Sequence, residues 1–165
     1  MSGFTFKQFK VEHDSCAMKV STDGILLGAW AYLKGANTLL DIGTGTGLLA
    51  LMCKQRQPAL SITAVEIDEA AYKQAQQNIA SSPWPNITVK HTTIQAFKQA
   101  APFDVVISNP PYFNRSLKGL SDARNTARHT DGLSFDELIH AYMRLSHEHS
   151  CFNVILPTTE AGLFI

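Results

Sequence analysis

The sequence predicts an α/β fold with a doubly wound, mostly parallel sheet. Three observations predict it. Apolar runs of strand length alternate with longer helical patterns along the chain. One apolar run ends in three alternating glycines, DIGTGTG, and then opens into a helical pattern, and a later one ends in NPPY. Strands that alternate with helices form parallel sheets with right-handed crossovers, so we expect a Rossmann-like architecture.

Length and composition indicate one globular domain without net charge. The chain has 165 residues, which is the size of one domain, with 45% hydrophobic and 17% charged residues, typical of a globular protein. Its net charge is zero and its pI is close to 7.0. It therefore lacks a global positive charge for nucleic acid, and any such partner must be held by a local patch.

No apolar run approaches the length of a membrane span, and the first residues, MSGFTFKQFK, lack the apolar centre of a signal peptide. We therefore expect a cytoplasmic protein without a membrane partner. The three cysteines, Cys16, Cys53 and Cys151, are far apart and form no metal-type pair. They are expected to be reduced, buried thiols, and no metal site is expected.

The N-terminal segment, residues 1–35, precedes the sheet. Apolar positions alternate in parts of residues 4–20, which predicts a β-hairpin or paired arm. Thr22 or Asp23 is placed to cap a short helix in the apolar run that follows. A plain cap is one interpretation of these two residues, and a segment that covers a bound cofactor is the other.

The remainder, residues 36–165, carries the predicted sheet. We expect a first strand from residue 38 up to the glycines, and further strands over residues 61–67, 87–94, 103–108 and 151–156. We expect helices over residues 48–57, 69–80 and 135–147, the last with a capping box, together with a short helical piece before Pro102 and the start of another helix at residues 158–165.

The glycine loop predicts a nucleotide-type site. Gly43, Gly45 and Gly47 allow positive φ and a close approach of a ligand to the backbone. A dinucleotide site has the spacing G-x-G-x-x-G, whereas this loop has G-x-G-x-G with Asp41 two residues before the first glycine. That carboxylate would repel phosphate and suits a cation. Glu66, at the end of the next strand, can accept hydrogen bonds from both hydroxyls of a ribose. An ordinary turn with polar strand ends is the alternative.

The NPPY motif, residues 109–112, predicts a second site at the same sheet edge. Two prolines remove two N–H donors, so that the Asn109 side-chain oxygen and the Pro110 carbonyl can both accept from a substrate –NH2 group. Two acceptors favour a tetrahedral nitrogen whose lone pair faces a methyl donor. Catalysis would then rest on alignment and electrostatics. Tyr112 offers a face for stacking a planar substrate. A rigid strand-to-loop turn is the alternative.

DIGTGTG, VEID and NPPY together resemble the class I S-adenosyl-L-methionine-dependent methyltransferases that act on planar amino groups. Within them, FKQFKVEHDSCAMKVSTDGILLGAWA, DIGTGTGLLALM and ISNPPYF resemble the bacterial tRNA1(Val) adenine-6-amino methyltransferases. The resemblance implies transfer of a methyl group to an adenosine next to the anticodon. It places the target base on Asn109, Pro110, Pro111 and Tyr112. We expect the cofactor to be held by Thr22, Asp23, Asp41, Gly43, Thr44, Gly45, Gly47, Glu66, Ile67, Thr93 and Asn109.

Two features depart from the family pattern. Many relatives place an acid after the third strand, against the adenine of the cofactor, where this chain has Thr93. Family members also continue through another helix and two strands, so the resemblance implies a C-terminally incomplete domain whose fifth strand is an exposed edge.

The loop after NPPY is rich in cations. Arg115, Lys118, Arg124 and Arg128 are candidates for phosphate contacts with tRNA, and a solvated loop is the alternative. Two other functions stay open from the residues alone. One is a protein methyltransferase acting on a glutamine amide, whose –NH2 makes the same hydrogen bonds. The other is a cofactor-binding domain without catalytic activity.

Overall fold

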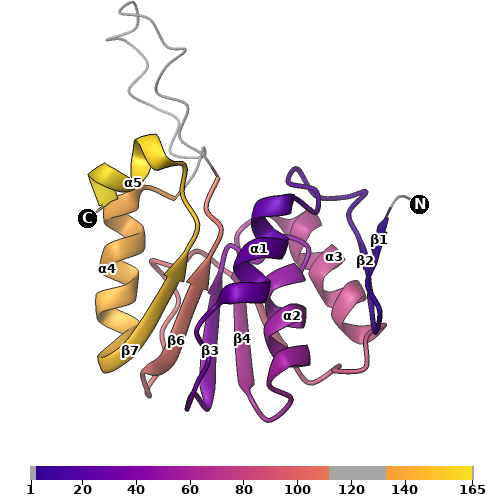
Figure 1. The fold of residues 1–165 in the computed structure, drawn as a ribbon, viewed down its shortest axis with the longest axis horizontal. Coiled ribbons are helices and arrows are strands. Elements are labelled where there is room, and N and C mark those ends of the chain that lie inside the picture. The colour runs from indigo at the N-terminus through magenta and orange to yellow at the C-terminus, as the bar shows by residue number, and fades with distance from the viewer. Residues whose placement is uncertain (1–2, 112–132, 165) are drawn as a thin grey trace, which may run out of the picture.

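The computed structural model describes residues 3–111 and 133–164, and its centre is a parallel sheet of five strands (Figure 1). The spatial order of the strands is β5-β4-β3-β6-β7, and every neighbouring pair is parallel. Their bounds are β3 Thr38–Ile42, β4 Ser61–Glu66, β5 Thr88–His91, β6 Phe103–Ser108 and β7 Ser146–Val154. β3 is the first strand of this sheet along the chain and lies at its centre. β4 and β5 follow on one side of it, and β6 and β7 follow on the other, so the doubly wound fold expected from the sequence is confirmed.

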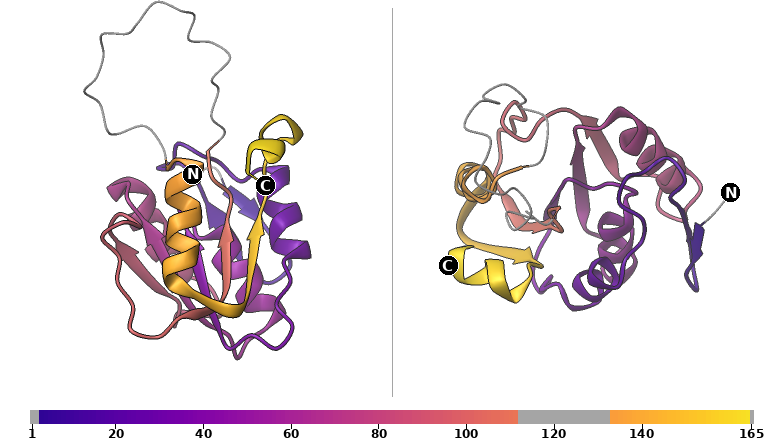
Figure 2. Two further views of the ribbon diagram at one scale, coloured as in Figure 1. Left: turned by 90° about the vertical axis from the view of Figure 1, so that its left-hand side faces the viewer. Right: turned by 90° about the horizontal axis from the view of Figure 1, so that it is seen from above.

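Helices cover both faces of this sheet (Figure 2). Helices α1 (Thr22–Trp30), α2 (Leu48–Arg56) and α3 (Glu69–Ala80) lie on one face, and α4 (Phe135–Leu145) lies on the other. Along β3, Leu39 packs in the core under α1 and α2, whereas Leu40 packs in the core under α4. Both faces of the sheet are therefore buried, which explains the almost wholly apolar strands. Helix α5 (Thr158–Phe164) follows β7.

The N-terminal segment forms the expected hairpin. Strands β1 (Gly3–Thr5) and β2 (Lys10–Glu12) pair in antiparallel fashion. Phe9 and Val11 are buried in the same core as α1 and α2. The hairpin is therefore packed onto the sheet domain rather than extended away from it.

The cap of α1 differs from the prediction. Neither Thr22 nor Asp23 is the N-cap; Ser21 is, and its hydroxyl accepts a hydrogen bond from Gly24 N at 3.2 Å. The helix begins at Thr22, three residues before the apolar run that starts at Ile25, so Thr22 and Asp23 belong to its first turn. The capping box of α4 is confirmed, since Ser134 and Glu137 make both reciprocal hydrogen bonds.

Two segments were predicted wrongly. The helical piece before Pro102 is absent: the described chain makes only a turn after Thr93, and this segment is fastened by Arg144, which donates to the carbonyls of Ile94 and Phe97 at 2.7 Å each. β7 begins at Ser146, five residues before the predicted start. Its first part is irregular, because the register shifts between Phe103 and Val105 of the neighbouring strand.

Asp104 fastens this irregular part of the sheet. Its Oδ2 accepts from the backbone N–H groups of Asn37 and Thr38 at 2.7 and 3.0 Å. Its Oδ1 lies 3.1 Å from Nε2 of His147. One carboxylate thus connects the beginnings of β3, β6 and β7, at the edge of the sheet opposite the glycine loop.

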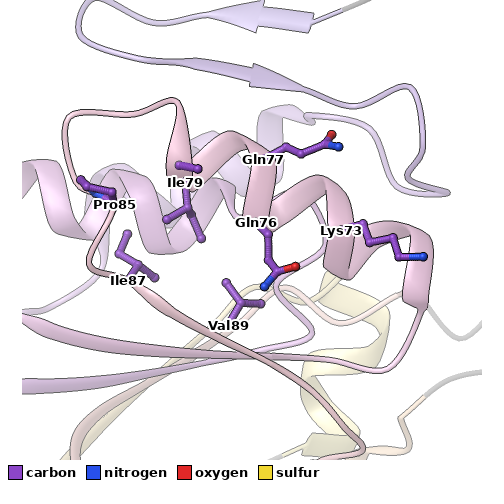
Figure 3. A pocket seen from close by; sticks show the side chains of 8 residues that line it. Lys73, Gln76, Gln77, Ile79, Pro85, Ile87 and Val89 are labelled. Carbon is purple, nitrogen blue, oxygen red and sulfur yellow. The ribbon is translucent and has the colours of Figure 1, made fainter.

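A groove of about 520 Å³ separates α3 from β5 (Figure 3). Its lining includes Lys73, Gln76, Ile79, Ile87 and Val89, and it contains none of the site residues predicted from the sequence. Among the described residues, no helix is long and apolar enough to cross a membrane.

Candidate functional site

The candidate site lies where the strand order reverses, at the carboxyl ends of β3 and β6. Ligands of open α/β sheets bind at this position because the connections diverge there and leave a crevice. The two strand ends are tied directly, since the buried Ser108 hydroxyl donates to the carbonyl of Ile42 at 2.9 Å. The loop after β3 and the NPP segment after β6 therefore share one edge of the sheet.

The glycine loop needs glycine for its backbone. Gly43, Gly45 and Gly47 have φ values of 69°, 56° and 83°, all in the left-handed region. A Cβ atom on Gly43 or Gly45 would have no other atom within 4 Å, so these two residues face open space. The amides of Gly43 and Thr44 donate to the Val65 carbonyl at 2.9 and 3.1 Å, which holds the loop against β4.

Asp41 lies beneath this loop and is fully buried. Its Oδ2 accepts a hydrogen bond from the Thr44 hydroxyl at 2.6 Å, and its Oδ1 has no partner among the described residues. Burial raises the pKa of Asp41 to about 7. An unpartnered buried oxygen is costly, and a cationic group nearby would lower that cost. Asp41 itself does not line the cavity at the glycine loop, so its role toward a cation stays a prediction.

Glu66 lies at the end of β4 and is held by three backbone amides. Its Oε2 accepts from Gly45 N at 2.8 Å, and its Oε1 accepts from the amides of Ile67 and Asp68 at 2.9 Å each. The carboxylate is therefore fixed beside the glycine loop. Ile67, next to it, is 65% exposed and presents an apolar surface at the sheet edge.

The N-terminal segment reaches the glycine loop. A small cavity of about 40 Å³ is lined by parts of residues 18–21, by Gly24, by the glycine loop and by Asn109. Lys19 and Ser21 belong to this lining, whereas Thr22 and Asp23 do not. The N-terminal segment thus contributes to the lining through Met18, Lys19, Val20, Ser21 and Gly24, and not through Thr22 or Asp23.

The NPP segment follows β6 directly. Asn109 is half-buried, Pro110 is buried and Pro111 is exposed. A Cβ atom on Gly24 of α1 would lie only 3.7 Å from Asn109 Nδ2, so α1 and Asn109 are close neighbours. Tyr112 and the four cations of the following loop, Arg115, Lys118, Arg124 and Arg128, lie outside the described residues.

Thr93 begins the turn after β5. Its hydroxyl accepts from Ala96 N at 3.1 Å, and the amide of the preceding Thr92 donates to the Glu66 carbonyl at 3.0 Å. The end of β5 is thus adjacent to the end of β4. Thr93 shares the sheet edge with the other predicted residues, and its hydroxyl already accepts one hydrogen bond.

Sequence reasoning missed Asn78 of α3. This side chain is 3% exposed and donates to the carbonyls of Glu12 and Thr46 at 2.8 and 2.9 Å. Its Oδ1 accepts from Glu12 N at 2.9 Å. The sequence could have indicated this residue, because Asn78 falls on the apolar stripe of an amphipathic helix. A buried amide side chain at such a position requires hydrogen-bond partners.

Comparison with known proteins identifies the family of this chain. The family model "Methyltransferase small domain" matches residues 25–126. A relative from Pseudoalteromonas translucida, named tRNA1(Val) (adenine(37)-N6)-methyltransferase, is 73% identical over 165 residues, which are 100% of this chain and 71% of the relative. The chain belongs to this methyltransferase family. A family member from Phocaeicola vulgatus, with the same name, is 54% identical over 98% of this chain and 69% of its own length.

Solved structures agree on the fold of the family. A ribosomal protein L11 methylase from Lactobacillus delbrueckii subsp. bulgaricus superposes with a TM-score of 0.61 at 19% identity, over 86% of this chain and 62% of that protein. Coclaurine N-methyltransferase, bound to N-methylheliamine and SAH, gives a TM-score of 0.58 at 15% identity, over 85% of this chain and 39% of that protein. These similarities confirm the Rossmann-like methyltransferase fold.

Proposed function

We propose that the chain transfers a methyl group from S-adenosyl-L-methionine to the exocyclic 6-amino group of an adenosine in tRNA, the reaction for which its relatives are named. The observation that carries the proposal is the adjacency of two sites at the switch point of the sheet. The glycine loop with Asp41 and Glu66 forms one site, and the NPP segment after β6 forms the other. The glutamine-amide alternative is not favoured, because the relatives are named for adenine.

The residues present fit the cofactor. The open faces of Gly43 and Gly45 leave room for a ligand beside the loop, and the buried Asp41, with its unpartnered Oδ1, lies beneath it. We assign the ribose hydroxyls to Glu66 and the adenine ring to the exposed Ile67 surface, with Thr93 nearby. When bound, S-adenosylmethionine supplies an electrophilic methyl group. The N-terminal segment, through residues 18–21, covers this site.

The NPP segment positions the nucleophile. The Asn109 side-chain oxygen and the Pro110 carbonyl accept from the two hydrogens of the adenine amino group. These hydrogen bonds draw the nitrogen lone pair out of conjugation and aim it at the cofactor site. A dedicated base is unnecessary, because nitrogen loses a proton readily once it is cationic, so alignment and electrostatics supply the rate enhancement. Tyr112 stacks the base, and Arg115, Lys118, Arg124 and Arg128 contact phosphates. A tRNA substrate also implies a cytoplasmic location.

Replacing Asn109 with alanine tests the assignment. With Asn109→Ala, kcat for methyl transfer to unmodified tRNA should fall by about 100-fold or more, because one acceptor for the amino group is lost. The affinity for S-adenosylmethionine should stay within about threefold of the wild type, since Asn109 only borders the cofactor site and Asp41 and Glu66 remain in place. The measurement is transfer of labelled methyl groups, with nucleoside analysis of the product and calorimetry of cofactor binding.

The matched control is Asn86→Ala, the same change at an exposed position in the turn after α3. It should leave both quantities unchanged. Loss of cofactor binding as large as the loss of kcat would contradict the role of Asn109. Cofactor binding by the wild-type chain with no methyladenosine in any tRNA would contradict the proposed reaction.

A further inference from the structure

The buried amide of Asn78 joins three parts of the chain that are far apart in sequence. It extends from α3, bonds both backbone groups of Glu12 in β2, and bonds the carbonyl of Thr46 in the glycine loop. We call this arrangement the hairpin–loop clasp: the Asn78 side chain with the backbones of Glu12 and Thr46. All three distances lie between 2.8 and 2.9 Å, within the range of strong amide hydrogen bonds.

The clasp acts on the glycine loop at Thr46. Thr46 stands between Gly45 and Gly47, both of which have positive φ. Gly47 is also the N-cap of α2 and has no side-chain capping bond. A fixed Thr46 carbonyl orients the peptide plane that Thr46 shares with Gly47. The Gly45 amide that binds Glu66 lies two peptide planes earlier in the same loop.

The same clasp fixes the N-terminal segment. The Asn78 amide pairs with Glu12 as a neighbouring strand would, through one donor and one acceptor. Residues 13–21 connect this point to α1, and the end of this stretch lines the cavity at the glycine loop. Holding Glu12 in place thus shortens the free length of the segment that covers the cofactor site.

We infer that Asn78 is a positioning residue for S-adenosylmethionine binding, which acts by holding the N-terminal hairpin and the glycine loop in one fixed geometry. The inference rests on the proposed function, because it assigns the cofactor to the glycine loop. Asn78 itself is buried behind the loop and does not face the cavity. Its effect should therefore fall on cofactor affinity and not on the chemical step.

The test is the variant Asn78→Ala. The KM for S-adenosylmethionine should rise about tenfold or more, as expected for the loss of a buried hydrogen-bond network, while kcat stays within about threefold. In the absence of cofactor, hydrogen exchange should quicken in residues 43–47 and in β2 together. Gln76→Ala, an exposed change on the same helix, should alter neither measurement.

A second variant covers the case in which Asn78→Ala fails to fold. Asn78→Asp keeps the shape and the acceptor for Glu12 N, but it removes the amide donors, and the same increase in KM is expected. An unchanged KM in a folded variant whose loop exchanges faster would overturn the inference, as would a loss of kcat at constant KM. Failure of the wild-type chain to bind S-adenosylmethionine would overturn the proposed function instead, an outcome seen without either variant.

Discussion

At the scale of single residues, Asp41 makes the stability of the fold depend on pH close to neutrality. Its pKa is raised to about 7 by burial, whereas an aspartate in an unfolded chain titrates near 4. A carboxyl group with a raised pKa stabilises the fold fully below about pH 4, and this contribution is lost as the pH rises toward 7. The size of the effect is on the order of 4 kcal/mol.

The variant Asp41→Asn should therefore flatten the pH dependence. We expect the free energy of unfolding of the wild type to fall between about pH 4 and pH 7, and that of the variant to change much less. Urea unfolding at several pH values in this window measures both. Parallel pH profiles of the two proteins would show that Asp41 does not titrate as its burial indicates.

At the scale of secondary-structure elements, the contact between α1 and α2 depends on the absence of a side chain at Gly28. A Cβ atom there would lie 2.6 Å from Met52 Sδ and 3.0 Å from Met52 Cβ. The motif is Gly24-x-x-x-Gly28, and a Cβ on Gly24 would likewise lie 3.1 Å from Leu48 Cδ2. The two helices thus approach closely along one stripe, which brings the start of α1 to Asn109.

Gly28→Ala should destabilise the fold by about 1–3 kcal/mol, the usual cost of overpacking, although alanine has the higher helix propensity. Thermal and urea unfolding measure the change. Ala29→Ser, on the exposed side of the same helix, should stay within about 0.5 kcal/mol of the wild type. A stabilised Gly28→Ala protein would mean that Met52 moves aside without cost and that the stripe does not fix the helix spacing.

At the scale of the whole molecule, Asp104 connects three strands at the sheet edge opposite the site. Hydrogen bonds from the backbone of Asn37, followed by the contact with His147, lower the pKa of Asp104 to about 2. A lowered pKa means stability that is present above about pH 4 and lost as the pH falls toward 2. This window lies below the one for Asp41, so the two effects are separable.

We expect Asp104→Asn to be less stable than the wild type at pH 7, and the difference to shrink as the pH falls from about 4 to 2. Equilibrium unfolding at several acidic pH values checks this. Glu148→Gln, an exposed change in the neighbouring part of β7, serves as the control. A stability difference that stays constant down to pH 2 would rule out the carboxylate as its source.

Most of the sheet could be predicted from the sequence, because buried parallel strands are short apolar runs and β6 matches its run residue for residue. The errors fall where distant contacts decide the local structure. The segment before Pro102 is held by Arg144, which lies 47 and 50 residues after its partners Phe97 and Ile94, and the start of β7 is held by Asp104. A pattern of neighbouring residues cannot predict contacts between segments this far apart in sequence.

In the candidate site, too, local patterns could place some residues, and contacts between distant segments place the others. The sequence could place Asp41, the glycines, Glu66 and Asn109 at one sheet edge, because strand ends and glycine spacing are local signals. It could not place Asn78, Ser21 and Lys19, since their positions follow from how the N-terminal hairpin and α1 pack on the sheet. The N-terminal cover stays a prediction, and the predicted cap of α1 was wrong, because Ser21 and not Thr22 or Asp23 is the N-cap.

Glu66 bears on the thermodynamics of ligand capture. Because three amides already immobilise its carboxylate, no rotamer freedom of this side chain remains to be lost when a ribose arrives. Ordering one such side chain at an interface usually opposes binding by about 0.5–1.5 kcal/mol. In this chain that ordering is completed during folding, so the entropy of ligand association should carry no contribution from Glu66.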